Sequence, residues 1–331
     1  MKYVDFESVN LRLSKIAFGC AGVMGRIGRA QALNAMQAAF DAGVTHFDVA
    51  RSYGFGEAEN VLGHFANGKR DRITIATKFG IAPPKHQRAL QFIKPVIRGL
   101  TRHAKALKAL VRSASTNALT PGAFDISSAR GSFDKSLCAL GLDYVDILFL
   151  HDCSPEDHLG DELLAWLEGL IKSGKIRTWG IATRREWIDT VSAAMPVKPR
   201  IVQCQGGVLF PAIPFATERV PAVLHSPFGG TAGMGAAYEK IKTACAVMQS
   251  DCGTHIVSSN LYPQLLLESA IHLSARNVVL CSMFDPKHIR LNVEAVERPL
   301  YTREQLETFI NALHSTPQMS IKRLTSEQRI A

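Results

Sequence analysis

Eight short apolar runs, rich in β-branched residues, recur along the chain, and each is followed by a longer stretch with a different pattern. The runs are nearly continuous instead of alternating between apolar and polar positions. This is typical of strands in a parallel sheet, which are buried on both faces. The eight predicted strands span residues 15–21, 44–50, 73–79, 145–151, 178–183, 201–205, 221–227 and 277–283.

The stretches between these runs carry apolar residues three or four positions apart, the spacing of one face of a helix. The clearest of them predict helices over 29–43, 161–175, 268–276 and 302–314. Gly43 and Gly174 stand near the ends of the first two, where glycine is the preferred terminating residue.

Strands that alternate with helices eight times predict an α/β fold, a closed (β/α)8 barrel of the TIM type. The rival is an open doubly wound sheet, which would carry a GxGxxG turn after its first strand. The segment after the first run reads GCAGVMGRIGRA and lacks that spacing, so the barrel is favoured.

We expect a single barrel domain over 1–331, because the chain shows no internal repeat and no low-complexity linker. At the N-terminus, the apolar positions of YVDF and LRLS flank a polar turn and predict a hairpin that closes the barrel floor. The residues over 314–331 are polar and form a predicted tail.

Composition narrows the class of protein. Hydrophobic residues make up 47% of the chain, which is ordinary for a protein with a large core. The N-terminus lacks the apolar stretch of a signal peptide, and no run approaches the ~18 apolar residues of a membrane span. Seven cysteines fall at scattered spacings without a CxxC pair. We therefore expect a reduced, cytoplasmic protein without a metal site.

The net charge of +9 comes from one segment of the chain. Ten Lys and Arg residues and no acid lie between Arg72 and Phe124, and the remainder is close to neutral. Most of this window belongs to a predicted basic insertion over 81–125, after the third strand. It has neither interleaved aromatic residues nor a recognised nucleic-acid-binding motif, so nucleic acid is not an expected partner.

Four ionisable residues lie at the ends of three consecutive predicted strands. Asp48 is near the end of the second strand, Tyr53 is in the loop after it, and Lys78 and His151 close the third and fourth. Each alone has an ordinary explanation as a loop cap, a packing ring, a solvated cation or a core histidine. Because strand ends build the active site of a (β/α)8 barrel, their shared placement predicts a catalytic group.

Longer segments around these residues resemble the aldo-keto reductase family. They read GVTHFDVARSYGFGEAENVLG, ITIATKFG, SLCALGLDYVDILFLHDC and WLEGLIKSGKIRTWGIAT, in family order. The resemblance covers most of the chain, broken by the insertion. It implies a TIM barrel, a nicotinamide coenzyme and carbonyl reduction by an Asp, Tyr, Lys and His set, whose roles fall on Asp48, Tyr53, Lys78 and His151.

The chemistry accounts for these residue types. Hydride delivery to a carbonyl carbon leaves negative charge on oxygen, so Tyr53 would supply a proton there. We expect the Lys78 ammonium to stabilise the phenolate and so lower the pKa of Tyr53. Asp48 would keep that ammonium charged, and the neutral imidazole of His151 would orient the carbonyl oxygen.

The resemblance also implies coenzyme-binding residues: Gly19, Cys20, Thr183, Gln203, His225, Ser226, Pro227, Phe228, Ser282, Met283, Lys287, His288 and Asn292. The chain departs from the family pattern among them. Ala182-Thr183 replaces the Ser-Asn pair that holds the nicotinamide amide. His225 replaces the tyrosine that stacks on the ring.

At the adenosine end, Met283, Phe284 and His288 stand where the family often grips the 2′-phosphate. Lys287 or Arg290 could substitute, and Asn292 matches the adenine-side asparagine. Family habit favours NADP(H) over NAD(H).

Within the insertion, residues 92–114 predict an amphipathic helix with a purely cationic face. A solvated helix tethered by its apolar face is one interpretation. A lid that attracts anionic substrate or coenzyme phosphates is another. Contact with an anionic membrane surface is a third, less favoured one.

The sequence thus predicts an NAD(P)(H)-dependent oxidoreductase. It would reduce an aldehyde or ketone, or oxidise the corresponding alcohol or sugar hemiacetal, with Tyr53 as general acid and base. The alternative is a coenzyme-binding regulatory or sensor subunit of the same fold with little turnover, which the changes at Ala182 and His225 would suit. A small-molecule carbonyl or sugar is the expected partner, and no oligomeric state is predicted.

Overall fold

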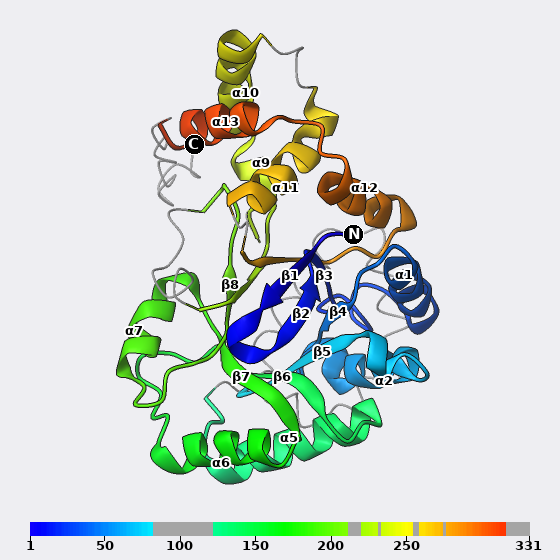
Figure 1. Ribbon diagram of the computed structural model, residues 1–331, viewed down its shortest axis with the longest axis vertical. Coiled ribbons are helices and arrows are strands. Elements are labelled where there is room, and N and C mark those ends of the chain that lie inside the picture. Colours follow the sequence, from blue (N-terminus) through cyan, green and yellow to red (C-terminus); the bar gives the residue numbers. More distant parts are fainter. Residues whose placement is uncertain (82–121, 211–219, 231–232, 254–257, 274–275, 316–331) are drawn as a thin grey trace, which may run out of the picture.

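Eight parallel strands close into a barrel in the computed structural model, in the order β10-β3-β4-β5-β6-β7-β8-β9 (Figure 1). The structure describes residues 1–81, 122–210, 220–230, 233–253, 258–273 and 276–315. The barrel strands are β3 (Ile16–Gly19), β4 (His46–Asp48), β5 (Thr74–Phe79), β6 (Val145–His151), β7 (Ile176–Ala182), β8 (Val202–Gln205), β9 (Ala222–His225) and β10 (Val278–Cys281). The predicted (β/α)8 barrel is confirmed, and each strand falls on one of the predicted runs.

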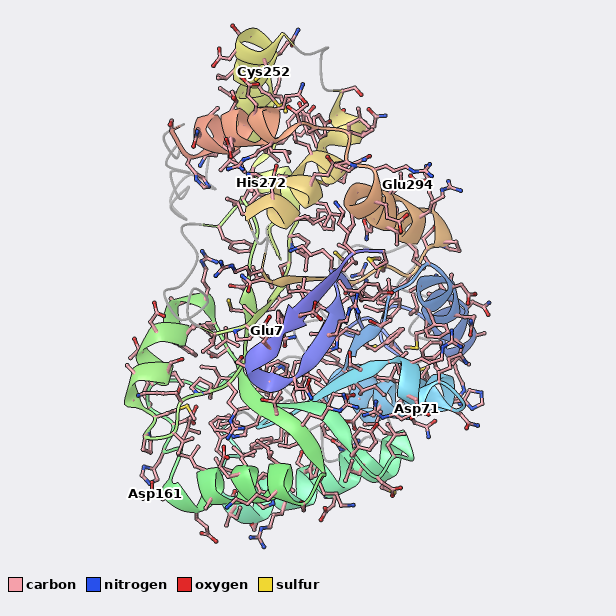
Figure 2. All side chains as sticks on the ribbon, viewed as in Figure 1. Glu7, Asp71, Asp161, Cys252, His272 and Glu294 are labelled. Atoms are coloured by element: carbon pink, nitrogen blue, oxygen red, sulfur yellow. The ribbon has the colours of Figure 1, made fainter. Side chains whose placement is uncertain are left out.

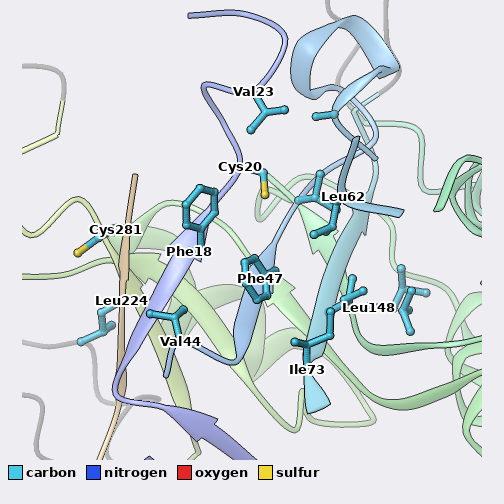
Figure 3. Close-up of a cluster of buried hydrophobic side chains, with 14 of the residues drawn as sticks. Phe18, Cys20, Val23, Val44, Phe47, Leu62, Ile73, Leu148, Leu224 and Cys281 are labelled. Atoms are coloured by element: carbon cyan, nitrogen blue, oxygen red, sulfur yellow. The ribbon is translucent and has the colours of Figure 1, made fainter. Parts of the chain in front are cut away.

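The strands are buried on both faces. Every residue of β5 and β10 is buried, as is every residue of β6 before His151. Outward-facing Phe18 and Phe47 pack against each other with ring centroids 5.6 Å apart. Figure 3 shows Leu62 of the next helix beside Phe47, in the layer between barrel and helices. This two-sided burial explains why the runs do not alternate.

Helices surround the barrel and form a lobe beside it. They are α1 (Arg29–Asp41), α2 (Ala58–Ala66), α5 (Ile126–Leu140), α6 (Asp161–Lys172), α7 (Ile188–Ala194), α9 (Gly233–Ala236), α10 (Tyr238–Cys252), α11 (Tyr262–Leu273), α12 (Pro286–Glu297) and α13 (Arg303–Ser315). The helices predicted over 29–43, 161–175 and 302–314 appear as α1, α6 and α13. The helix predicted over 268–276 begins six residues earlier, at Tyr262, and ends at Leu273.

Short 3₁₀ turns connect several of these elements. They are η1 (Glu7–Val9), η2 (Tyr53–Gly56), η3 (Arg70–Arg72), η4 (Arg185–Trp187) and η5 (Ser259–Leu261). Of these, η2 matters most for the site because it carries Tyr53.

The predicted N-terminal hairpin is confirmed. Strands β1 (Tyr3–Phe6) and β2 (Leu11–Ser14) pair antiparallel, and Figure 1 shows them across one end of the barrel. Its inward residues share a cluster with residues from inside the barrel, among them Ala17, Ala76, Ile147 and Phe149. The hairpin residues of that cluster are Val4, Phe6, Leu11 and Leu13. The hairpin therefore plugs the barrel floor and leaves the opposite end for the strand termini.

Four helices form a lobe beside the barrel, comprising α9, α10, α11 and α13. Their apolar side chains make a separate cluster that includes Ile241, Met248, Leu266 and Phe309. Figure 2 shows Cys252 and His272 on this lobe, far from Asp161 at the start of α6. Among the helices that the structure describes, none combines the length and apolarity that a membrane crossing needs.

Two sequence predictions fall mainly beyond the described ranges. Most of the basic insertion over 81–125, including the helix over 92–114, lies outside the described residues. Its end is described: Phe124 packs on Phe79, and the Asp125 side chain caps α5 by accepting from the Ser128 backbone. The polar tail over 314–331 also lies outside, except His314 and Ser315, which belong to α13.

Candidate active site

Three neighbouring strands bring the predicted catalytic residues to one end of the barrel. Asp48 ends β4, Lys78 is the penultimate residue of β5, and His151 ends β6. Asp48 pairs in register with Ala76, and Lys78 with Phe149. Residues two apart on a strand point to the same face, so Lys78 and Ala76 share the barrel interior. The side chains of adjacent strands therefore meet at the mouth opposite the hairpin.

Asp48 and Lys78 form a buried ion pair. The Lys78 Nζ lies 2.5 Å from each carboxylate oxygen of Asp48 and donates to the Val49 carbonyl at 3.0 Å. Gln203 donates from Nε2 to Asp48 Oδ2 at 2.8 Å. Because each side chain is at most 2% exposed, both charges depend on these partners and not on water.

Tyr53 lies against this pair. The Lys78 Nζ is 5.3 Å from the centroid of the Tyr53 ring, and the His151 ring meets Tyr53 edge-on with centroids 6.0 Å apart. Tyr53 opens a 3₁₀ turn in which Gly54 and Phe55 have φ of 58° and 61°. A Cβ atom at Gly54 would lie 2.6 Å from the Val23 carbonyl oxygen and collide with it, so glycine is required for this approach.

Burial dominates the electrostatics of the site. It lowers the pKa of Lys78 from its ordinary value, although Asp48 opposes this. The pKa of His151 is held well below its usual range by burial, then by the Lys78 ammonium and His225. Burial also lowers the pKa of His225 to about 4. Both imidazoles are therefore neutral near pH 7.

The expectation that the pKa of the Tyr53 phenol is lowered was wrong. Burial, followed by the Asp48 carboxylate and the neighbouring Cys20, raises the pKa of Tyr53 well above its ordinary value. The desolvated phenolate is disfavoured, and the neighbouring anion adds to that cost. Tyr53 is therefore a fully protonated donor at neutral pH.

The predicted nicotinamide-side residues lie around the same mouth. Cys20 is buried beside Asp48 and donates its backbone N–H to the Asp48 carbonyl at 2.8 Å. The buried Thr183 donates its hydroxyl to the Cys153 carbonyl and its backbone N–H to the Gln203 carbonyl. His225 ends β9, half-buried, with Nδ1 2.9 Å from the Ser226 hydroxyl.

Other predicted coenzyme residues follow β9 and β10. Gly19 and Ser282 are neighbours, since the Ser282 hydroxyl lies 3.4 Å from the Gly19 carbonyl. Pro227 is buried, and the half-buried Phe228 packs against both the main core and the helical lobe.

The residues predicted to bind the adenosine side of the coenzyme differ in their exposure. Lys287 and His288 are exposed in the first turn of α12, which the Asp285 carboxylate caps by accepting from the Lys287 backbone at 2.8 Å. Met283 is fully buried, and Asn292 donates to its sulfur at 3.6 Å. Met283 therefore packs in the core and presents little surface to a ligand.

Sequence reasoning missed a second buried carboxylate beside the site. Glu59 on α2 is fully buried and binds Arg51 and Thr77, which belong to the two segments that carry Tyr53 and Lys78. An acid among the apolar residues of the segment AENVLGHFA was the available signal. Within the described ranges, no group of three or more His, Cys, Asp or Glu side chains could hold a metal ion.

Comparison with known proteins identifies the protein family of this chain. A profile described as the Aldo/keto reductase family matches residues 15–312. The chain therefore belongs to the aldo-keto reductase family.

Individual relatives are more distant. The chain is 30% identical over 250 residues to 6-dehydroglucose reductase of Agrobacterium fabrum, covering 70% of this chain and 73% of that one. It is 29% identical to D-threo-aldose 1-dehydrogenase of a Pseudomonas species, over 67% of this chain and 65% of the relative. It is 25% identical to aldo-keto reductase YhdN of Bacillus subtilis, over 60% of this chain and 52% of the relative. The matches to the last two span about half to two thirds of the relatives' own lengths.

Solved structures share the fold at low identity. An aldo-keto reductase of Bacillus halodurans in its holo form superimposes with a TM-score of 0.67 at 20% identity, covering 94% of this chain and 96% of that one. An aldo-keto reductase of Klebsiella pneumoniae, solved in complex with NADPH, superimposes with a TM-score of 0.64 at 18% identity. The match covers 96% of this chain and 97% of that one.

Proposed function

We propose that this protein is an NADP(H)-dependent reductase of aldehydes or ketones, with Tyr53 as the general acid. The observation that carries the proposal is the Asp48–Lys78 pair, buried at the barrel mouth against the Tyr53 ring. A buried ion pair of this kind adds little to stability by itself. It is well suited to stabilise a phenolate that forms during proton transfer.

The reaction would divide between coenzyme and protein. A bound nicotinamide would supply the hydride to the carbonyl carbon. Tyr53 would then donate its proton to the developing alkoxide, which is far more basic than a phenol. The ammonium of Lys78 would stabilise the phenolate left behind, and Asp48 would keep that ammonium charged. His151, neutral at pH 7, would donate a hydrogen bond to the same oxygen.

The residues at the mouth fit a nicotinamide coenzyme. The half-buried ring of His225, with Nδ1 next to the Ser226 hydroxyl, offers a flat face near Lys78. Thr183 and Gln203 supply polar groups on the adjacent strands. At the far end, exposed Lys287 and His288 would meet the 2′-phosphate, and this favours NADP(H). The NADPH complex of the Klebsiella protein is consistent with this choice.

Sugar carbonyls are the favoured substrate class. Two of the relatives above are named for 6-dehydroglucose and D-threo-aldose. The open-chain aldehyde or ketone of a sugar would accept a hydride at this site, and the reverse reaction would oxidise a sugar hemiacetal.

A panel assay tests the proposal. Purified protein is mixed with NADPH and with sugar aldehydes, aliphatic aldehydes and ketones, and loss of NADPH absorbance is followed. We expect turnover with at least one carbonyl class and none without carbonyl. Tight NADPH binding without turnover on any substrate would overturn the reductase assignment.

That last outcome would favour the second candidate, a coenzyme-binding sensor subunit. Two sequence features support this candidate, Ala182 and His225, which alter the contacts to the nicotinamide that the family usually makes. The presence of all four catalytic residues makes the reductase the better supported of the two.

A further inference from the structure

Glu59 is a fully buried carboxylate that none of the catalytic steps uses. It lies in the first turn of α2, and its side chain has no exposed surface. Its Oε1 accepts the Thr77 hydroxyl at 2.7 Å, and its Oε2 accepts the Arg51 guanidinium at 3.0 Å. A buried carboxylate is costly unless each oxygen has a partner, and both do here.

The two partners of Glu59 belong to the segments that carry catalytic residues. Arg51 lies between Asp48 and Tyr53, and its guanidinium also donates to the Gly56 carbonyl at 3.4 Å. It thereby links the segment before the turn that holds Tyr53 to the last residue of that turn. Thr77 precedes Lys78 on β5 and points to the opposite face, because side chains alternate along a strand. Lys78 therefore points into the barrel while Glu59 holds its neighbour from outside.

Glu59 also contributes charge to the site. Burial lowers the pKa of Lys78, and this is opposed first by Asp48, then by Cys20 and last by the Glu59 carboxylate. The Arg51 guanidinium balances Glu59 from the loop side. The other titratable groups near the ammonium are Tyr53, His151, His225 and His46.

We propose that Glu59 is a positioning residue that holds Tyr53 and Lys78 in mutual register by tying the loop after β4 to strand β5. This inference rests on the proposed reductase function. Its effect on position is indirect, because the side-chain contacts of Glu59 are to Arg51 and Thr77, and only its charge acts on Lys78 directly.

The chain offers a closely matched control in Asp146. This carboxylate is also fully buried, is paired with Arg70 at 2.7 Å and Arg177 at 3.1 Å, and accepts from the Ile75 backbone of β5 at 2.7 Å. It holds the other end of the same strand. Asp146 lies on β6, and Asp146→Asn therefore removes a buried, arginine-paired carboxylate that binds β5 without touching the segment that carries Tyr53.

The experiment compares Glu59→Gln, Thr77→Val and Asp146→Asn with the wild-type chain in NADPH-dependent carbonyl reduction across pH. For Glu59→Gln we expect kcat to fall about 10- to 100-fold, since a misplacement of about 1 Å can cost on the order of 100-fold. NADPH affinity should stay unchanged. The alkaline limb of the kcat–pH profile, where Lys78 loses its proton, should move to lower pH. Glu59→Gln removes a carboxylate that favours the Lys78 ammonium, while Arg51 keeps its charge.

The other variants separate position from charge and from stability. Thr77→Val should lower kcat without moving the alkaline limb, because the Glu59 charge remains. Asp146→Asn should lower stability while leaving kcat and the alkaline limb at their wild-type values. Wild-type kinetics in Glu59→Gln, or the same kinetic change in Asp146→Asn, would overturn the inference.

Two further outcomes are decisive. If Glu59→Gln does not fold, an unchanged kcat in Thr77→Val overturns the positioning role, and a reduced one supports it. If the wild-type chain binds NADPH but reduces no carbonyl, the proposed function fails, and the positioning role fails with it. Turnover that is insensitive to Glu59 would instead leave the function standing and remove only the inference.

Discussion

At the scale of single residues, the site depends on how Lys78 keeps its charge inside the barrel. Burial alone would favour a neutral amine, and the two Asp48 oxygens with the Val49 carbonyl oppose this. Gln203 in turn satisfies the carboxylate. Several hydrogen bonds thus converge on one ammonium group, and the proposed stabilisation of a transient phenolate would require such an arrangement.

The neutral state of His151 leads to a pH prediction. Because its pKa lies well below the ordinary value, His151 does not gain a proton as the pH falls through about 6.5, where an unperturbed histidine would. We expect kcat/KM for carbonyl reduction to show no limb near that pH. A plot of kcat/KM against pH over the stable range checks this. A single-proton limb near pH 6.5 that disappears in His151→Asn would contradict it.

The sequence allowed the placement of the candidate catalytic residues to be predicted, but not their environment. Asp48, Lys78 and His151 were recognisable because each lies at or near the end of a buried run, a position that depends on local pattern alone. The raised pKa of Tyr53 depends first on burial and then on Asp48 and Cys20, which reach it from other parts of the barrel. Glu59 was missed for a similar reason, because its partners Arg51 and Thr77 become neighbours only when α2 packs on the barrel.

At the scale of elements, the hairpin is the clearest case of a small unit with a structural task. Leu13 is fully buried against residues from inside the barrel, whereas the Arg12 side chain beside it is 69% exposed. We expect Leu13→Ala to lower the free energy of unfolding by about 2–5 kcal/mol. Arg12→Ala should change it by no more than about 0.5 kcal/mol.

Chemical denaturation of both hairpin variants measures these differences. The comparison separates burial in the barrel floor from any general effect of altering β2. Equal losses of unfolding free energy in the two variants would contradict the role of the hairpin as a plug of the barrel floor.

The elements differ in how well the sequence predicted them. The eight strands were recoverable because continuous apolar runs reflect burial on both faces. Helix α11 was placed too late, since Leu265 and Leu266 pack in the lobe while Leu267 packs against the barrel core. A helix with apolar residues all round has no amphipathic stripe, so its true start at Tyr262 was hidden.

At the scale of the whole molecule, buried neutral histidines couple stability to pH. His46 is fully buried in the barrel, with Nδ1 2.9 Å from the Thr74 hydroxyl, and burial lowers its pKa to about 4. Between the ordinary value of about 6.5 and this value, the unfolded chain binds a proton that the folded chain does not. Stability is therefore highest above that window and falls as the pH drops through it.

We expect the free energy of unfolding to fall by ~1.4 kcal/mol per pH unit for each such histidine. Denaturant unfolding at several pH values between about 7 and 4 measures the slope. In His46→Gln the slope of unfolding free energy against pH should decrease by the contribution of about one proton, because glutamine cannot titrate. A slope identical to that of the wild-type chain would contradict the buried neutral state of His46.

The central claim is that Tyr53 donates the proton in a carbonyl reduction supported by Lys78 and Asp48. Its most direct test is kcat/KM for NADPH-dependent reduction by Tyr53→Phe, with Tyr238→Phe on the exposed face of α10 as the matched control. We predict a loss of at least about 100-fold in Tyr53→Phe, because general acid catalysis contributes on the order of 100- to 10,000-fold. NADPH affinity should be unchanged in both variants, and Tyr238→Phe should retain full activity. Wild-type turnover in Tyr53→Phe would contradict the account.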